Sequence, residues 1–157
     1  MMNLFKAFLF LSAMFYLTHG AAAQTPEPTS ESYEMLARIY ELQANDGDAQ
    51  AAYDLGFLYN SGLGVEQDLP RAFQWYLTAA KGGLLQAQDK VSMFYSVGVG
   101  TIRSDELAYF WILIAQYNGG QNLSSQMIRL EESMTAETRE RAQRNARRCV
   151  ESAYSDC

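Results

Sequence analysis

The side chains that could do chemistry in this chain are few, and their spacing fits no catalytic or metal site. The only histidine, His19, lies in an N-terminal segment with the features of a cleavable signal, so the mature chain would have no imidazole for catalysis or metal binding. Asp46 and Asp48 flank Gly47, but the rest of a calcium-loop pattern is missing. The S-x-x-K and K-T-G motifs of acylating serine enzymes are also absent. We therefore predict no catalytic residue, no metal site and no cofactor, and expect a protein that is not an enzyme.

The two cysteines, Cys149 and Cys157, lie at the C-terminus. In an oxidising compartment an even number of cysteines favours a disulfide. Such a bond would tie the tail to the last helix and stabilise the fold by about 2–3 kcal/mol in the loop-entropy model. A redox-active pair is the alternative, although the C-x-x-C spacing is absent.

Residues 1–23 have the three parts of a secretory signal. Lys6 is their only charge, and the apolar run from Ala7 to Leu17 is shorter than the roughly 20 residues of a transmembrane helix. Small residues precede Gln24, so we expect cleavage after Ala23, which would leave 134 of the 157 residues. This predicts a periplasmic or secreted protein without stable membrane insertion; an uncleaved anchor is the alternative.

The charge of the mature chain argues against a nucleic-acid partner. Removing Lys6 lowers the formal net charge from −6 to −7. The composition, 48% hydrophobic and 19% charged, is that of an ordinary globular domain, which follows a flexible leader at residues 24–30. Five arginines between 139 and 148 make the final helix basic. Compensation of the helix dipole is the simplest interpretation, and docking of an acidic partner is the alternative.

The chain repeats itself with a period of 36 residues. Residues 51–59 return as 87–95, and the glycine pattern of residues 62–64 returns at 98–100. Four further positions agree: Ala72, Trp75, Leu77 and Ala79 return as Ala108, Trp111, Leu113 and Ala115. A fixed period of this length indicates a solenoid of supersecondary units.

Each unit is predicted to contain two helices. Apolar residues at i, i+4, i+7 and i+8 from Ala51 form the stripe of the first helix, and the glycines of residues 62–64 end it. Asp68 can cap the second helix, and Ser104 takes this position in the second unit. Partial units flank the two repeats. Before them, residues 31–45 resemble the second helix of a unit. After them, residues 123–132 replace a first helix with Asn122 as its cap, and Thr135 caps a polar helix that runs to about residue 153.

This pattern resembles the Sel1-like repeat, which is related to the tetratricopeptide repeat. Residues 51–87 match A-x-x-x-L-G-x-x-Y-x-x-G-x-G-V-x-x-D-x-x-x-A-x-x-W-Y-x-x-A-A-x-x-G-x-x-x-A at every written position. The second unit departs from it at several positions, among them Ser92, Thr101, Ser104, Ile112 and Gln116, and Leu123 replaces the closing alanine. A tetratricopeptide array has a period of 34 residues, which leaves no room for the loop at residues 62–67.

The resemblance covers roughly residues 31–150 and implies a bacterial, exported member of the family. The implied fold is all-α, a short right-handed α-solenoid of helix-turn-helix repeats with capping helices. The repeat domain would span residues 31–157, with repeats at about 48–83 and 84–119 and a C-terminal cap at 120–157.

The resemblance also implies a function. Such proteins act as protein–protein interaction modules or adaptors, and periplasmic relatives include regulators that restrain a sensor kinase. We therefore expect another protein or peptide to bind in the concave groove, and a role in regulating an envelope protein or signalling complex. The alternative is a binder of a small molecule or cell-wall fragment, such as a β-lactam or a muropeptide. Relatives linked to penicillin-like molecules carry a cysteine pair in each repeat, however, and neither unit here has one.

Positions of the first helices that lie off the packing stripe are expected to face this groove. Phe57 and Met93 are the most informative, because they place apolar area where the repeat does not need it. Packing against neighbouring units or against the N-terminal helix is the alternative. The full set of candidate partner-binding residues is Gln50, Tyr53, Phe57, Asn60, Gln86, Asp89, Met93, Ser96 and Arg129.

Overall fold

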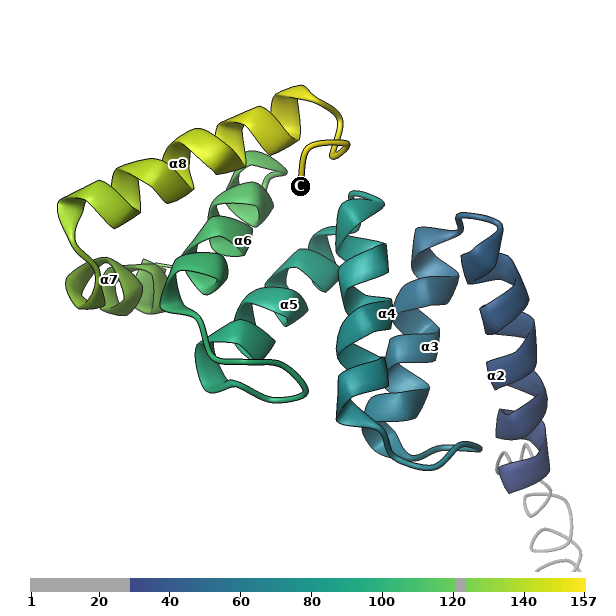
Figure 1. The fold of residues 1–157 in the computed structure, drawn as a ribbon. Helices are drawn as coiled ribbons and strands as arrows, with labels where there is room; N and C mark the ends of the chain where they lie inside the picture. Colours follow the sequence, from purple (N-terminus) through teal and green to yellow (C-terminus); the bar gives the residue numbers. More distant parts are fainter. Residues whose placement is uncertain (1–28, 121–123) are drawn as a thin grey trace, which may run out of the picture.

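The computed structural model describes residues 29–120 and 124–157, which form seven α-helices and no strand (Figure 1). From α2 to α7 each helix packs against the next, and α8 packs against α6. The predicted all-α solenoid of paired helices is thereby confirmed. The helices are α2 (Ser30–Asn45), α3 (Ala49–Ser61), α4 (Leu69–Lys81), α5 (Leu85–Val97), α6 (Asp105–Tyr117), α7 (Ser124–Ser133) and α8 (Ala136–Glu151).

Three predictions fall wholly or mostly outside these residues: the signal at 1–23, the flexible leader at 24–30 and the cap at Asn122. Of the leader only Thr29 and Ser30 are described, and they form the cap and the first residue of α2. Among the described helices α2–α8, none combines the length and the apolar character needed to cross a membrane.

Polar side chains fix the starts of the helices. Asp68, Ser104 and Thr135 each accept a hydrogen bond from a backbone N–H in the first turn of α4, α6 and α8, as their positions predicted. Asp48 does the same for α3 and accepts two such bonds. Its equivalent in the second unit is Leu84, which offers no side-chain cap to α5. The cap at the repeat boundary is therefore present in only one of the two units.

The second glycine of each G-x-G turn packs against the start of a preceding helix. Gly64, with φ of 68°, lies so close to the backbone of Tyr33 in α2 that a Cβ would collide with it. Gly100, with φ of 64°, lies in the same way against the backbone of Leu69 in α4. Because Tyr33 and Leu69 are 36 positions apart, α2 occupies the place of a second helix, as its sequence predicted.

The two units pack their helix pairs differently. In the first unit Gly56 lies under the ring of Tyr76, where a Cβ would come within 2.9 Å of the ring carbon Cδ1. In the second unit the equivalent residues are Ser92 and Ile112, both buried. The Ser92 hydroxyl donates a hydrogen bond of 2.9 Å to the carbonyl of Ala108. In the first unit the small Gly56 accompanies the large Tyr76, and in the second unit the larger Ser92 accompanies the smaller Ile112. These two departures of the second unit from the repeat pattern therefore compensate each other in volume.

Helix α8 covers the outer side of α6. Its buried face consists of Ala142, Ala146 and Cys149, which belong to the main core. Polar contacts fix its position: the side chain of Arg141 donates to both carboxylate oxygens of Glu106 at 2.8 and 2.7 Å. Small residues allow the two helices to approach closely, which is how a polar terminal helix can close a solenoid.

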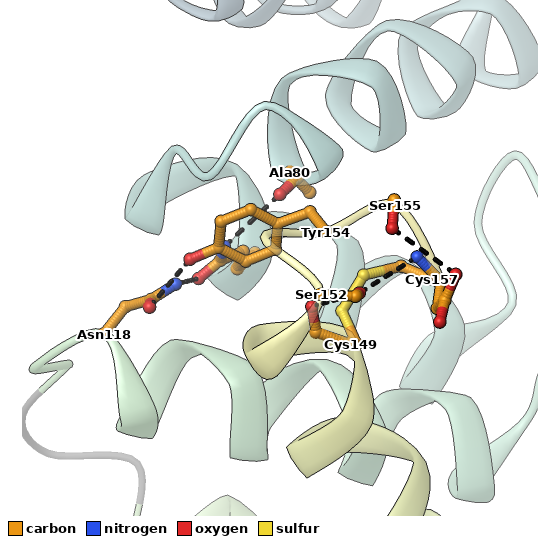
Figure 2. Close-up of a disulfide and its surroundings, with 9 residues drawn as sticks. Ala80, Asn118, Cys149, Ser152, Tyr154, Ser155 and Cys157 are labelled. Atoms are coloured by element: carbon orange, nitrogen blue, oxygen red, sulfur yellow. Dashed lines mark hydrogen bonds between the residues drawn. A yellow bond between two sulfur atoms is a disulfide. The ribbon is translucent and has the colours of Figure 1, made fainter.

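The tail after α8 returns to the repeats. Cys149 and Cys157 form a disulfide with a Cα–Cα distance of 5.0 Å (Figure 2). Within this loop the Tyr154 hydroxyl donates to Asn118 Oδ1 at 2.8 Å, and Asn118 Nδ2 donates to the buried Gln88 at 2.8 Å. Gln88 Nε2 in turn donates to the carbonyl of residue 80 at 3.2 Å. This chain of hydrogen bonds connects the C-terminal tail with both repeats.

Candidate functional site

A groove of about 390 Å³ lies between α5, the start of α6 and α7. Helix α5 contributes one wall with side chains at i, i+3 and i+4, and α7 contributes the other with side chains at i, i+3, i+4 and i+7. Each helix therefore presents one face to the groove. The lining residues are Met93, Ser96, Val97, Arg103, Asp105, Gln126, Arg129, Leu130 and Ser133.

The base of the groove is apolar. Leu130 is buried in the main core. Met93 and Val97, by contrast, leave 51% and 68% of their area exposed although they belong to a helix that packs on both sides. A flexible methionine adapts its shape to different neighbours. The groove thus offers unoccupied apolar area to a binding partner.

Two arginines lie at this groove, and their surroundings differ. The Arg103 guanidinium is 3.1 Å from Asp105 Oδ1, and its hydrogen bond is the main reason why the pKa of that carboxyl lies below its ordinary value. Arg129 is exposed on α7 and takes part in none of the ion pairs found within residues 29–120 and 124–157. The groove therefore has one guanidinium that is neutralised locally and one that is not.

The two hydroxyl groups of the groove donate to backbone carbonyls of their own helices. Ser96 donates to the carbonyl of Met93 at 2.9 Å, and Ser133 donates to the carbonyl of Leu130 at 2.9 Å. Ser133 also contributes, after Arg103, to the lowered pKa of the Asp105 carboxyl. The groove as a whole offers apolar contact and a positive charge.

Comparison with known proteins identifies the repeats. Residues 49–84 and 85–119 each match the family described as the Sel1 repeat. Two adjacent segments of this chain are thus similar to the Sel1 repeat. The chain is 30% identical over 81 residues to the protein sel-1 homolog 2 of Homo sapiens, a match that covers 51% of this chain and 12% of that protein.

Two solved structures are similar to the Sel1 repeat fold described above. The crystal structure of c5321, a protective antigen present in uropathogenic Escherichia coli strains that displays an SLR fold, superimposes with a TM-score of 0.71. The two chains are 22% identical, and the match covers 96% of this chain and 31% of the other. A Sel1 repeat protein from Oxalobacter formigenes has a TM-score of 0.58 and 27% identity, covering 77% of this chain and 48% of the other. This chain thus spans less than half the length of each of these relatives.

The structure brings three of the predicted binding residues together. Met93 and Ser96 of the second Sel1 repeat line the groove with Arg129 of α7. Phe57, the equivalent of Met93 in the first repeat, does not line it, although 48% of its area is exposed. The exposure of Phe57 and Met93 argues against the alternative that both pack fully into neighbouring units.

The remaining predicted residues of the first Sel1 repeat have local contacts of their own. Tyr53 packs against Tyr76 with a ring-centroid distance of 5.3 Å, so part of its surface belongs to the core. The Gln50 side chain donates to Asp54 Oδ1 at 3.0 Å, whereas Asn60 only accepts a bond at its backbone carbonyl. None of these residues lines the groove.

Two predicted residues of the second Sel1 repeat lie near its start. Gln86 is exposed. Asp89 takes the position of Tyr53 and is half-buried, and its Oδ1 is buried without a hydrogen-bond partner. This burial raises the pKa of the Asp89 carboxyl above its ordinary value. The ionised form of Asp89 is therefore disfavoured by its burial.

Sequence reasoning did not include several groove residues. Val97 lies four positions after Met93 and could have been found as the next apolar residue on the same helix face. Gln126 and Leu130 share a face with Arg129, but the predicted helix there was irregular compared with the repeat. Gln126 Nε2 also donates to Ser92 at 3.3 Å, a contact across 34 residues that no local pattern shows.

Proposed function

We propose that this chain is an exported protein-interaction module that binds a segment of another protein in the groove between α5 and α7. The observation that carries this proposal is the exposed apolar area of Met93 and Val97 inside a concave, largely apolar site. Sel1 repeats are in general protein-interaction scaffolds, and their role here agrees with that.

The shape of the groove favours a protein segment over a small molecule. Small ligands are usually enclosed, with most of their surface buried in the pocket. Here Met93 and Val97 stay more than half exposed, so the walls remain open to solvent. A chain segment that continues beyond the groove fits this shape, whereas a β-lactam or muropeptide-like ligand would be left largely uncovered.

The proposal of export rests on two features. Residues 1–23 have the composition of a secretory signal, and the cysteines at the other end are joined in a disulfide. In the envelope, a module of this kind would hold or restrain an envelope protein or signalling complex.

The experiment compares two variants that each replace one exposed apolar side chain by alanine. Met93→Ala removes an apolar side chain from the groove, and Ile128→Ala removes one that is 52% exposed on α7 but does not line the groove. Each protein is used for crosslinking and quantitative affinity capture from the native envelope fraction. We expect Met93→Ala to lose most of the captured partner while Ile128→Ala retains it, with thermal unfolding unchanged in both. Equal capture by both variants and the wild type would contradict the proposal.

A further inference from the structure

The charges around the groove limit what its occupant can be. Three charged side chains line it: Arg103, Asp105 and Arg129. Because Arg103 and Asp105 pair with each other, only the charge of Arg129 remains to be matched. This charge is positive, although the chain as a whole has a formal net charge of −6. It favours an occupant with a carboxylate and disfavours one with a cationic group at the same place.

The apolar part of the groove sets the second requirement. Met93 and Val97 lie one helical turn apart on α5, and Leu130 of α7 follows Arg129 directly. An occupant that covers Met93 and Val97 with an apolar side chain therefore shares the groove with Arg129. A chain segment that holds a large apolar residue and a carboxylate near each other meets both requirements.

From this arrangement we infer that the groove binds an acidic, apolar protein segment, with an apolar side chain on Met93 and Val97 and an Asp or Glu paired with Arg129. The inference rests on the proposed function and adds the chemistry of the partner. Met93 supplies adaptable contact area, and Arg129 determines which segments are accepted. An exposed ion pair contributes little affinity, so its main effect is on selectivity.

The test uses a library of random peptides selected for binding to the intact protein. We expect the selected peptides to contain Leu, Ile or Phe within four residues of Asp or Glu. The dissociation constant of one labelled peptide is then measured by fluorescence anisotropy for the wild type and for four variants. Met93→Ala is expected to weaken binding roughly tenfold, because an apolar anchor loses most of its contact area.

The charge is tested with a matched pair of substitutions. Arg129→Glu and Arg147→Glu change the net charge equally, but Arg147 lies on α8 away from the groove. We expect Arg129→Glu to weaken binding about fivefold or more and Arg147→Glu to change it less than twofold. Arg129→Gln, which removes the charge without reversing it, should have an intermediate effect. A peptide in which Lys replaces the acidic residue should bind better to the Arg129→Glu variant than to the wild type.

The outcomes separate the two proposals. If Met93→Ala weakens binding but Arg129→Glu and Arg147→Glu have equal effects, the groove binds peptides and the inference about charge is wrong. If the selected peptides lack acidic residues, the inference about charge is also wrong. If peptides bind and Met93→Ala has no effect, the groove is not the binding site and the proposed function fails together with the inference.

Discussion

Exchanging the Gly56–Tyr76 pair of the first repeat for the residues of the second tests how the two helix pairs achieve their packing. The single substitutions are Gly56→Ser and Tyr76→Ile, and the double substitution reproduces the pair formed by Ser92 and Ile112. If the two positions compensate each other, the double variant will be more stable than the sum of the single effects allows.

The magnitudes follow from the contacts. A Cβ at residue 56 would lie 2.9 and 3.0 Å from two carbons of the Tyr76 ring, so Gly56→Ser should cost about 1–3 kcal/mol through overpacking. Tyr76→Ile removes ring contacts with Tyr53 and Phe94, at centroid distances of 5.3 and 5.5 Å, and should cost about 2–4 kcal/mol. In the double variant the clash disappears, and the hydroxyl of the serine introduced at position 56 can donate to the carbonyl of Ala72. This hydrogen bond should raise the free energy of unfolding by about 1 kcal/mol. We therefore expect a coupling free energy of about 2–4 kcal/mol.

The free energy of unfolding is measured by urea denaturation of all four proteins, followed by circular dichroism. The reasoning about compensating pairs is refuted if the double variant is destabilised by the sum of the single effects to within about 0.5 kcal/mol. The reverse exchange, Ser92→Gly with Ile112→Tyr, provides an independent cycle in the second repeat, and its coupling should have the same sign.

Removing the disulfide with Cys149→Ser and Cys157→Ser should lower the free energy of unfolding by about 2–3 kcal/mol, since it frees a loop with a separation of 8 residues; an unchanged urea midpoint would contradict this. Burial raises the pKa of Asp89, so its charge destabilises the fold above about pH 4. Asp89→Asn should therefore raise the free energy of unfolding by up to about 1 kcal/mol at pH 7 and leave it unchanged near pH 3. The hydrogen bond from Arg141 lowers the pKa of Glu106, so the stabilisation is fully present above the ordinary pKa of about 4.5 and is lost as the pH falls through the lowered pKa. Arg141→Ala should therefore destabilise the protein more at pH 7 than near pH 3. Thermal unfolding at the two pH values checks both charge predictions, and differences that do not depend on pH would oppose them.

Most of the helical architecture could be predicted because its signals are local. The caps at Asp68, Ser104 and Thr135 and the glycines that end α3 and α5 act through backbone groups within a few residues, and the structure places them as predicted. The period of 36 residues repeats these signals, which is why even α2 could be predicted as a second helix. A repeat makes the contacts between neighbouring units predictable too, because the same surfaces meet each time.

The functional surface was predicted only in part, since its residues come together through irregular elements. Met93, Ser96 and Arg129 were named from the repeat, but Val97, Gln126 and Leu130 join them only because α7 packs beside α6 and faces α5. Helix α7 departs from the repeat, so its register could not be copied from the first two units.

The sequence by itself determined the helix pairs, their boundaries and the absence of a histidine from residues 24–157. Only the tertiary structure decided how the C-terminal tail packs against these helix pairs. Tyr154 reaches Asn118 across 36 residues, and Asn118 reaches the buried Gln88 across another 30. Such contacts depend on how whole helices pack, because a side chain finds a partner far along the chain only after hydrophobic burial has brought the two helices together. The groove beside α7 also forms only when the helices pack together. Its lining residues could therefore be identified from the tertiary structure and not from the repeat alone.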